Sequence, residues 1–374
     1  MKRLVFLMSD TGGGHRAACA AIQAALEDLY PGAFACDMLD FYRGLPPILA
    51  RQPDVYSDWV SSSPWSYMAV VQAMELVGRV SWLRNLMYRW LRRSILGMLR
   101  THPADVYVCA HSAAVHGGLM GLRESGRGTP FLTVVTDYAS PYRAWFNPES
   151  EVTFVGAPEA ARRALRGGVP PDRVRLVGQP IHPRFQGIPD RCEARAALGW
   201  PELPTVLLHG GGAAIGRLVE AARAIDSVCQ AHLAVVAGTN AALEERLRRT
   251  CWQGRVSVYG FLERMELALA AADVVVTKAG PSSLAEAFAA HRPVVIYWAI
   301  PYQESGNVTY AVCHGAGLWA PGPVRTAQAV ARLLQDPATL AGMSAAAGRL
   351  ARPNAAHDIA REIYAVVAER SRIR

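Results

Sequence analysis

Short apolar runs alternate with segments of helical periodicity along the second half of the chain. The runs are TVLLHG, HLAVVAG, RVSVYG, DVVVTKAG and PVVIYWA, and the segments between them cover residues 214–226, 241–249, 263–271 and 282–290. Strands that alternate with helices of about 10–15 residues form a parallel sheet with right-handed crossovers. The pattern predicts an α/β fold in which ligands bind at the carboxyl ends of the strands.

The first half of the chain shows the same alternation at wider spacing. The sequence predicts strands at 3–8, 105–110, 131–136 and near 152–156. Residues 177–204 are rich in proline and glycine, which indicates a connection between domains. The stretch 325–374, rich in alanine and arginine, predicts two or three helices. With 374 residues, 51% of them hydrophobic, the chain can form two α/β domains, each with its own core.

The composition of the chain limits the classes of binding partner. The formal net charge of +8 favours an anionic partner, which could be a nucleic acid, a nucleotide or a membrane surface. The seven cysteines are scattered without metal-ligand spacing, as is typical of reduced thiols in an intracellular protein. We find no signal-peptide pattern, no apolar run long enough to span a membrane and no D-x-D motif. We therefore expect no metal and no cofactor.

The stretch SDTGGGHRAACAAIQAAL follows the first predicted strand. Its glycines, Gly12, Gly13 and Gly14, predict a tight turn, and His15 is expected in the first turn of the helix that follows. Free N–H groups and the positive end of the helix dipole suit an anion or a hydroxyl-bearing ligand there. The alternative is a tight turn beside an incidental histidine, because the motif is neither G-x-G-x-x-G nor a P-loop.

The second half carries two further motifs of this kind. Gly210, Gly211, Gly212 and Gly216 lie between a predicted strand and a predicted helix, where a turn can bind phosphate. In TKAGPSSLAEAF the helix is expected to begin at the Pro–Ser–Ser stretch, and Glu286 one turn later could accept hydrogen bonds from two ribose hydroxyls. Complementing the helix dipole is the alternative role for this glutamate. A third group of polar residues follows a predicted strand, namely Gln303, Glu304 and Asn307. They could bind sugar hydroxyls, or they could be ordinary polar residues of a surface loop.

Basic and aromatic residues concentrate between residues 59 and 100. Glu75 is the only acidic residue of this segment, which holds four of the nine tryptophans. On a helical wheel one face carries Leu83, Leu86, Met87, Trp90 and Leu91, and the other carries Arg89, Arg92, Arg93 and Arg100. The pattern is typical of a helix on an anionic membrane, contacting it through Trp82, Arg89, Trp90, Arg92 and Arg93. An ordinary surface helix is the alternative, and nucleic acid is not expected because no recognised module accompanies the patch.

Several motifs together resemble the monogalactosyldiacylglycerol synthases. They are SDTGGGHRAACAAIQAAL, VTDYASPYRAWF, VGQPIHPRF, HGGGAAIG and TKAGPSSLAEAFAAHRPVVIYWAIPYQESGNVTYAV, in this order over residues 3 to about 320. These enzymes are inverting glycosyltransferases of the GT-B fold, related to the processive diacylglycerol glucosyltransferases and, more distantly, to MurG. The opening SDTGGGHRA is more similar to the enzymes that transfer galactose than to the other members of this group.

The resemblance implies a GT-B fold with two Rossmann-like domains facing each other across a cleft. It places an acceptor and membrane-facing domain at 1–188, a UDP-sugar domain at 189–355 and a last helix that crosses back to the first domain at 356–374. It implies that Glu286 holds the ribose, that Phe261 and Leu262 flank the uracil, and that the diphosphate lies near Gly211, Gly212 and Ser283. The sugar would be held by Gln303, Glu304 and Asn307. The sequence departs from the family at Ser282, where glycine or a small residue is usual, and at Tyr302, where glycine is usual.

Transfer of a sugar from UDP needs a base for the acceptor hydroxyl. We expect His15 to be this base, with Asp137, at the end of a strand, as the rival base or as the group that orients the histidine. The alternative for Asp137 is an aspartate that caps a loop. Gly13, Gly14 and His111 are expected to line the acceptor side, and His116 to line a pocket. For both of these histidines the alternative is a polar side chain with satisfied hydrogen bonds.

The expected reaction moves a hexose, galactose being favoured, from a UDP-sugar to the 3-hydroxyl of 1,2-diacylglycerol. Alternatives are transfer from UDP-glucose or UDP-N-acetylglucosamine to a lipid, a UDP-sugar epimerase of the same architecture, or a non-catalytic nucleotide-sugar-binding membrane protein. The absence of a transit-peptide-like extension favours a peripheral enzyme on the cytoplasmic face of a bacterial membrane.

Overall fold

The computed structural model of the chain describes residues 1–11, 13–212 and 217–373. The chain divides into two compact units. Unit 1 comprises residues 1–183, the short segment 301–303 and the chain from Asn354 onward, and unit 2 comprises 184–300 and 304–353. The boundaries expected at residues 188 and 355 stay predictions.

Unit 1 is built on a six-stranded parallel sheet with the order β2-β1-β3-β4-β5-β6. Its strands are β1 (Lys2–Met8), β2 (Phe34–Asp40), β3 (Val106–Cys109), β4 (Phe131–Val134), β5 (Val152–Val155) and β6 (Val174–Leu176). The sequence did not predict β2 or β6. Strand β2 is an edge strand with mostly half-exposed residues, and β6 has only three residues, so neither forms a clear apolar run.

Helices cover both faces of this sheet. They are α1 (Gly14–Leu29), α2 (Pro47–Ala50), α3 (Gln52–Ser62), α4 (Pro64–Arg79), α5 (Ser81–Thr101), α6 (Ser112–Ser125), α7 (Pro158–Arg166) and α16 (Ala355–Ile373), with 3₁₀ turns η1 (Tyr42–Gly44), η2 (Arg143–Trp145) and η3 (Pro171–Arg173). Among the described residues, no helix has the length and apolar character that a membrane span requires.

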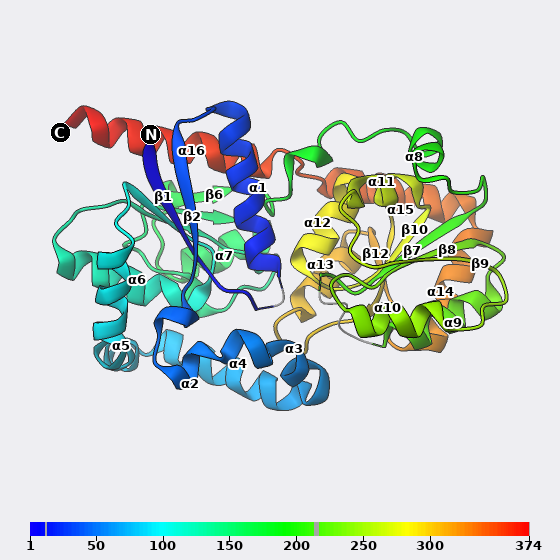
Figure 1. Cartoon of the computed structure of the whole chain (residues 1–374), viewed down its shortest axis with the longest axis horizontal. Helices are drawn as coiled ribbons and strands as arrows, with labels where there is room; N and C mark the ends of the chain where they lie inside the picture. Colours follow the sequence, from blue (N-terminus) through cyan, green and yellow to red (C-terminus); the bar gives the residue numbers. More distant parts are fainter. Residues whose placement is uncertain (12, 213–216, 374) are drawn as a thin grey trace. The chain divides into compact units, whose positions relative to one another are not determined.

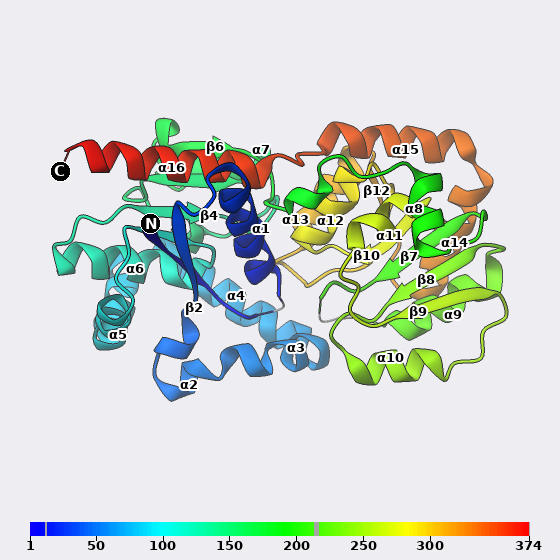
Figure 2. The same cartoon turned by 45° about the horizontal axis from the view of Figure 1, so that its top comes forward.

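The alternation of side chains along β1 supplies two cores. Leu4, Phe6 and Met8 pack with α1 and with α16, which run side by side (Figures 1 and 2). Val5 and Leu7 point to the opposite face and pack with α5 and α6. Both sets are almost fully buried, as expected for a parallel strand covered on both faces.

Unit 2 contains a second six-stranded parallel sheet, with the order β12-β11-β10-β7-β8-β9. Its strands are β7 (Thr205–His209), β8 (His232–Val236), β9 (Arg255–Tyr259), β10 (Val274–Lys278), β11 (Val294–Trp298) and β12 (Gly317–Trp319). The strand order reverses between β7 and β10, as it does in doubly wound sheets at the point where ligands bind.

Around this sheet lie the helices of unit 2. The strands and helices expected from its alternating pattern are confirmed, except that residues 214–216 of the helix expected at 214–226 lie outside the described residues and α9 begins at Leu218. The helices are α8 (Arg191–Leu198), α9 (Leu218–Val228), α10 (Ala241–Arg248), α11 (Met265–Ala271), α12 (Pro281–Ala289), α13 (Ser305–Cys313), α14 (Pro323–Gln335) and α15 (Pro337–Leu350). The turn η4 (Pro183–Phe185) precedes them within the predicted connection.

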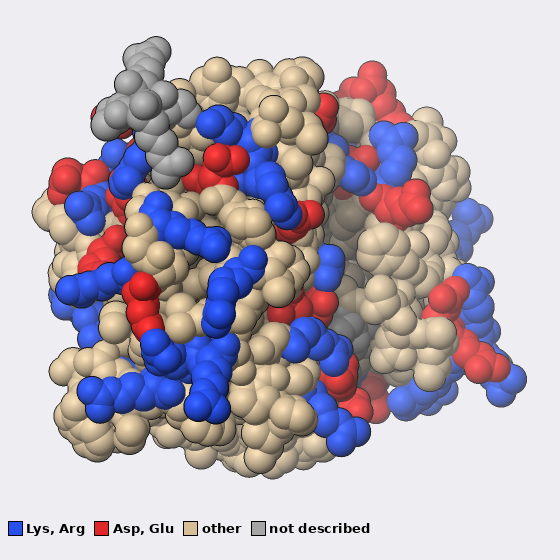
Figure 3. Space-filling model, turned by 60° about the vertical axis from the view of Figure 1, so that its left-hand side comes forward, with Lys and Arg blue, Asp and Glu red and all other residues tan. Residues whose placement is uncertain are grey.

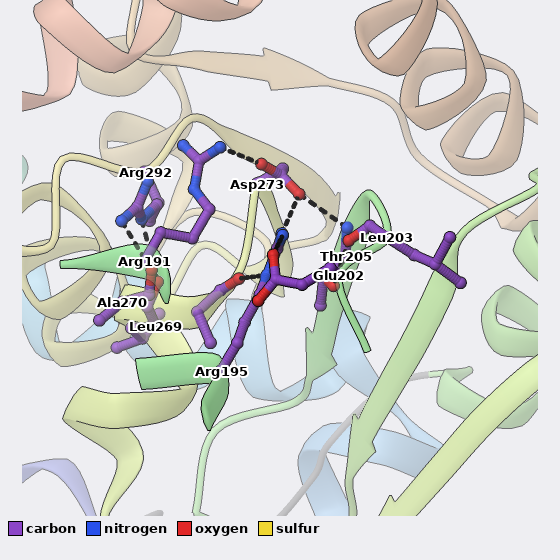
Figure 4. Close-up of polar contacts among 10 residues, drawn as sticks. Arg191, Arg195, Glu202, Leu203, Thr205, Leu269, Ala270, Asp273 and Arg292 are labelled. Atoms are coloured by element: carbon purple, nitrogen blue, oxygen red, sulfur yellow. Dashed lines mark hydrogen bonds and ion pairs between the residues drawn. The ribbon is translucent and has the colours of Figure 1, made fainter. Parts of the chain in front are cut away.

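A buried ion cluster fastens α8 to the amino-terminal ends of β7 and β10. Asp273 accepts hydrogen bonds from Arg195 (2.7 Å) and from the Thr205 backbone N–H (2.7 Å), and it pairs with Arg191 at 2.5 Å (Figure 4). Both Arg195 and Asp273 are 8% exposed. Arg292, close to this cluster, donates to the Leu269 and Ala270 carbonyls, and burial together with the neighbouring arginines lowers its pKa to about 10.

Candidate active site

His15 lies at the start of α1, as the sequence predicted. Gly14 is the first residue of the helix, and Gly13 caps it with φ 79°, a left-handed conformation that favours glycine. No side chain caps this helix end, so its first N–H groups stay available. Gly12 lies outside the described residues.

Two oxygen atoms fix the ring of His15. Its Nδ1 is 2.8 Å from the Ala110 carbonyl oxygen and 2.8 Å from the Thr136 hydroxyl. Since a carbonyl can only accept, Nδ1 carries the proton and Nε2 is the basic nitrogen. Nε2 has no hydrogen-bond partner among the described residues. Burial lowers the pKa of His15 to about 4, against the opposing effect of the Ala110 hydrogen bond, so the ring is neutral near pH 7.

Asp137 is buried near the same histidine. The Trp145 indole N–H donates to its Oδ2 (2.5 Å), and the indole ring lies 6.3 Å from the ring of His15. Gln303 donates to Oδ1 at 3.4 Å and accepts a hydrogen bond from the Tyr67 hydroxyl at 2.9 Å. The amide of Gln303 is therefore engaged within unit 1.

His111 belongs to this group as well. It caps α6 by accepting the Ala113 N–H at Nδ1, and its ring packs edge-on against His15, with 4.6 Å between the centroids. Tyr42 packs against its other side at 5.4 Å. Burial and the neighbouring His15 keep the pKa of His111 well below its usual value, so it is also neutral. Unit 1 therefore brings together Gly13, Gly14, His15, His111 and Asp137.

Unit 2 forms a second group at the carboxyl ends of β7 and β10. Gly211 has φ 76°, and a Cβ there would lie 3.4 Å from the Lys278 side chain and 3.9 Å from the Ser283 hydroxyl. Helix α12 begins just after Gly280 with no side-chain cap. A lysine, a hydroxyl and a free helix start thus surround the turn that contains Gly211 and Gly212, an arrangement that suits an anion. Gly216 lies outside the described residues.

Lys278 and His209 were not singled out from the sequence. The Lys278 side chain is 14% exposed, and its ammonium pairs with Glu304, whose second oxygen accepts the Ile300 N–H at 2.9 Å. His209 is buried, its Nε2 has no partner among the described residues, and burial and Lys278 lower its pKa to about 4. Both are the last residues of their strands. Because ligands bind at the carboxyl ends of parallel strands, this position could have indicated a role in the site.

Glu286 lies on α12, one turn after its start, and is half-buried. Burial raises its pKa to about 7, and the charge of Arg184 partly offsets this effect. Its carboxylate makes no hydrogen bond among the described residues, so both oxygens are free to accept ligand hydroxyls. Phe261, which follows β9, is 67% exposed, and Leu262 beside it is half-buried.

The three residues expected to hold a sugar do not share one set of contacts. Gln303 bonds within unit 1, Glu304 is tied to Lys278, and Asn307 is buried and donates to the Ala279 carbonyl at 2.9 Å. The preceding Tyr302 has φ 68°, in the left-handed region that a β-carbon disfavours. The glycine usual at this position in the resembled family would avoid that strain.

Helix α5 packs into the core through one side and leaves another side exposed. Its buried residues are Tyr88, Leu91, Ile95, Met98 and Leu99. Leu86 and Trp90, expected on the apolar face, are 54% and 59% exposed. Trp82 is exposed too, and at helical spacing Arg89 and Arg93 fall between these apolar residues, on the same outward side. Arg92 instead pairs with Glu124.

Further exposed apolar residues lie on the helices that precede α5, namely Ile48, Val55, Trp65, Val70 and Leu76. Figure 3 shows many Lys and Arg side chains and few acidic ones in the lower part of the face turned forward. The described residues contain no cluster of His, Cys, Asp and Glu that could hold a metal ion.

Comparison with known proteins identifies the family. The profile of the monogalactosyldiacylglycerol (MGDG) synthases matches residues 15–181, and that of the glycosyltransferase family 28 C-terminal domain matches 205–359. A probable chloroplastic MGDG synthase of Nicotiana tabacum is 32% identical over 387 residues, which cover 99% of this chain and 72% of that protein. The chain belongs to the MGDG synthase family. The resemblance seen in the sequence is thereby confirmed.

Solved structures show the fold of this MGDG synthase homologue. MurG of Acinetobacter baumannii superposes with a TM-score of 0.62 at 15% identity, covering 97% of this chain and 99% of that one. A UDP-GlcNAc 2-epimerase of Neisseria meningitidis, bound to UDP-GlcNAc, gives 0.61 at 11% identity, covering 97% and 100%. The chain therefore has the GT-B fold with two Rossmann-like domains, as predicted. At these identities the likeness shows the fold alone.

Proposed function

We propose that this protein transfers galactose from UDP-galactose to the 3-hydroxyl of 1,2-diacylglycerol, with inversion, to form a β-galactosyl lipid. Membership of the MGDG synthase family gives the reaction class. The observation that carries the proposal is His15, a neutral histidine at a free helix start whose Nδ1 is held and whose Nε2 is unoccupied. That geometry suits a general base for a hydroxyl group.

In the proposed reaction, Nε2 of His15 takes the proton of the acceptor hydroxyl. The hydroxyl oxygen forms a bond to C1 of the sugar while the bond from C1 to the diphosphate oxygen breaks, and UDP leaves with the electron pair. Lys278, Ser283 and the start of α12 stabilise the charge that develops on the diphosphate. No residue forms a covalent bond to the sugar, so a single displacement inverts the configuration at C1.

We propose that the two parts of the chain bind different substrates. Residues 1–188 bind the acceptor, 189–355 bind the donor, and 356–374 complete the first domain. In the donor domain Glu286 binds the ribose, Phe261 and Leu262 flank the uracil, and Gly211, Gly212 and Ser283 contact the diphosphate. Gln303, Glu304 and Asn307 position the sugar, Glu304 acting through Lys278.

The test is a panel of UDP-galactose, UDP-glucose and UDP-N-acetylglucosamine, each labelled in the sugar and supplied with diacylglycerol vesicles. We expect labelled monogalactosyldiacylglycerol from UDP-galactose alone. Glucolipid would change the donor but keep the reaction class. Conversion of UDP-N-acetylglucosamine to its 2-epimer without acceptor would assign the chain to the epimerases, and donor binding without turnover would make it a nucleotide-sugar sensor.

Replacement of Glu286 with alanine is expected to weaken UDP binding about 10-fold or more, because each lost charge-assisted hydrogen bond contributes about 1.5–3 kcal/mol. Wild type should bind UDP more tightly than 2′-deoxy-UDP, and the variant should bind both alike. Because the pKa of Glu286 is raised to about 7, affinity of the wild type should fall as pH drops below 7 and the carboxylate gains a proton.

Titration calorimetry at pH 6 and pH 8 measures these affinities. Glu245→Ala is the matched control, since this glutamate is 63% exposed and pairs only with a neighbouring surface arginine among the described residues. Equal discrimination against 2′-deoxy-UDP in wild type and Glu286→Ala would remove the ribose assignment.

Replacement of Lys278 with methionine is expected to lower kcat about 10²–10³-fold, the usual effect of removing a group that stabilises transition-state charge. UDP affinity should fall while uridine affinity stays unchanged, because only the diphosphate contacts the ammonium. The variant leaves Glu304 buried without its cation, so the double variant Lys278→Met/Glu304→Gln is measured beside it to separate folding from binding. Unchanged UDP affinity in both folded variants would contradict the role of Lys278.

We also propose that the protein is peripheral on a membrane, on the cytoplasmic face in a bacterium, and that the outward side of α5 contacts the anionic lipid. Exposed Trp82 and Trp90 flank Arg89 and Arg93, which suits an interface where aromatic rings and cations meet headgroups. Each arginine near such a surface contributes about 1 kcal/mol, so Arg89→Gln/Arg93→Gln should weaken vesicle binding about 30-fold at low salt.

Sedimentation with anionic vesicles checks this expectation. The control is Arg223→Gln/Arg255→Gln, which removes the same charge from exposed positions of unit 2. If both double variants bind vesicles equally, the effect is one of net charge and the outward side of α5 is not the membrane contact.

A further inference from the structure

An apolar cavity lies in unit 1 beside the His15 group. It is lined by residues of α4, α5, α6 and the η2 region, and its volume is about 70 Å³. Apolar side chains dominate its walls, among them Phe41, Met74, Met87, Leu91 and Ile95. Helices α5 and α6, which supply most of the lining, lie side by side (Figures 1 and 2).

Two buried polar atoms of the cavity lining lack hydrogen-bond partners. Among the described residues, the buried Nε of Arg84 and Nδ1 of His116 have no hydrogen-bond partner, and both side chains line the cavity. His116 is neutral, because burial and the charge of Arg84 lower its pKa to about 4. A buried donor left unpaired costs about 1–3 kcal/mol, so the Arg84 N–H is suited to a ligand that brings an acceptor.

The lining excludes several kinds of ligand. The described lining residues include no aspartate or glutamate, so nothing there would bind a cationic group. Most of the lining is apolar, which does not suit a sugar or a nucleotide that carries polar groups over its whole surface. A hydrocarbon chain with an ester or carboxyl oxygen at its head matches both parts of the cavity.

The cavity also shares its wall with the proposed acceptor site. Ser112 and Ala113 line it and directly follow His111, whose ring contacts His15. Phe41 lines it and directly precedes Tyr42, which packs on the other side of His111. A chain held in the cavity would leave its head close to the His15 group.

We infer that this cavity binds one acyl chain of the diacylglycerol acceptor, with the ester carbonyl accepting the Arg84 N–H. The inference rests on the proposed function, and it assigns to this cavity the selection of the lipid acceptor. A volume of about 70 Å³ holds only the first part of a chain. Met74 and Met87 supply the adaptability for a longer one, because methionine side chains change rotamer readily.

Filling the cavity tests the inference. Met87→Trp places a bulky ring in it, whereas Leu165→Trp makes a similar change at a position of α7 that is 45% exposed and belongs to no proposed site. Each buried methylene contributes about fourfold in affinity, so excluding two or three should raise the KM for dioleoylglycerol roughly 15- to 60-fold. The KM for dibutyrylglycerol and the kcat should change little, and Leu165→Trp should behave as wild type. Equal KM values for wild type and a folded Met87→Trp would overturn the inference.

A second measurement does not depend on turnover. Diacylglycerol that carries a diazirine at the end of one acyl chain is photolysed with the whole protein, and labelled peptides are mapped by mass spectrometry. We expect labels on α4 and α5 that excess dioleoylglycerol removes. Labelling there without galactosyl transfer would retain the cavity and refute the proposed function. Transfer with labels only outside the cavity would refute the cavity, and competition by oleate rather than by diacylglycerol would show a fatty-acid site instead.

Discussion

Replacing His15 with alanine is expected to lower kcat about 10²–10⁴-fold, the usual contribution of a positioned general base. UDP affinity should hardly change, because the groups proposed to bind the nucleotide all belong to unit 2. Single-turnover kinetics with UDP-galactose and diacylglycerol measure the chemical step, and calorimetry measures UDP binding.

The pH profile of the wild type gives an independent check. Only the neutral imidazole can accept the proton, and burial lowers the pKa of His15 to about 4. The kcat at saturating UDP-galactose should therefore hold as pH falls through 6.5, where an ordinary histidine is half protonated, and should be lost only as pH approaches 4. Thr136→Val, which removes one of the two contacts at Nδ1, should give a smaller loss of kcat.

The rival assignment has a distinct outcome. If Asp137→Asn abolishes turnover while His15→Ala stays within a few-fold of wild type, the aspartate is the base and the histidine only a contact. His314→Ala, at an exposed position of unit 2, controls for the loss of a histidine in general.

Replacing Asp273 with alanine is expected to lower the free energy of unfolding by about 3–5 kcal/mol. The change leaves the buried Arg195 without its anion, removes the partner of Arg191, and leaves the Thr205 N–H without its acceptor. Denaturant unfolding monitored by circular dichroism measures the loss. Any fall in activity should follow from unfolding alone, because the cluster lies at the strand ends opposite Lys278.

Glu202 provides the matched control for this cluster. It pairs with the same Arg195 at 3.3 Å but is 67% exposed, so Glu202→Gln should cost less than about 1 kcal/mol. If the two variants lose similar stability, burial of the Asp273 pair does not determine its contribution.

The sequence predicted features whose signals are local. His15 was found because a strand, a glycine turn and a helix follow one another within a few residues, and the Leu4 to Met8 run was recognisable as a buried strand. Lys278 was missed because its role depends on Glu304 and Gly211, which are far from it in sequence. A lone lysine at the end of a strand gives no pattern of its own.

The buried side of α5 could not be predicted for a different reason. Apolar residues occur on more than one side of this helix, so its periodicity alone does not decide which side is buried. Packing against α6 and Phe41 selects Leu91 and Ile95 and leaves Trp90 outside. For the same reason the cavity beside His116 could not be predicted, since its walls come from separate helices and a 3₁₀ turn.

The path of the chain has a consequence for biosynthesis. Unit 2 is nearly continuous in sequence, but a core of unit 1 needs α16, whose Ala356, Ile359, Ala360, Ile363 and Val367 pack against α1 and the first sheet. A ribosome makes β1 well before α16, because most of unit 2 lies between them in the chain. The apolar side chains of α1 that α16 covers therefore stay exposed until α16 has been made. Chaperones have this interval of synthesis in which to bind the first unit.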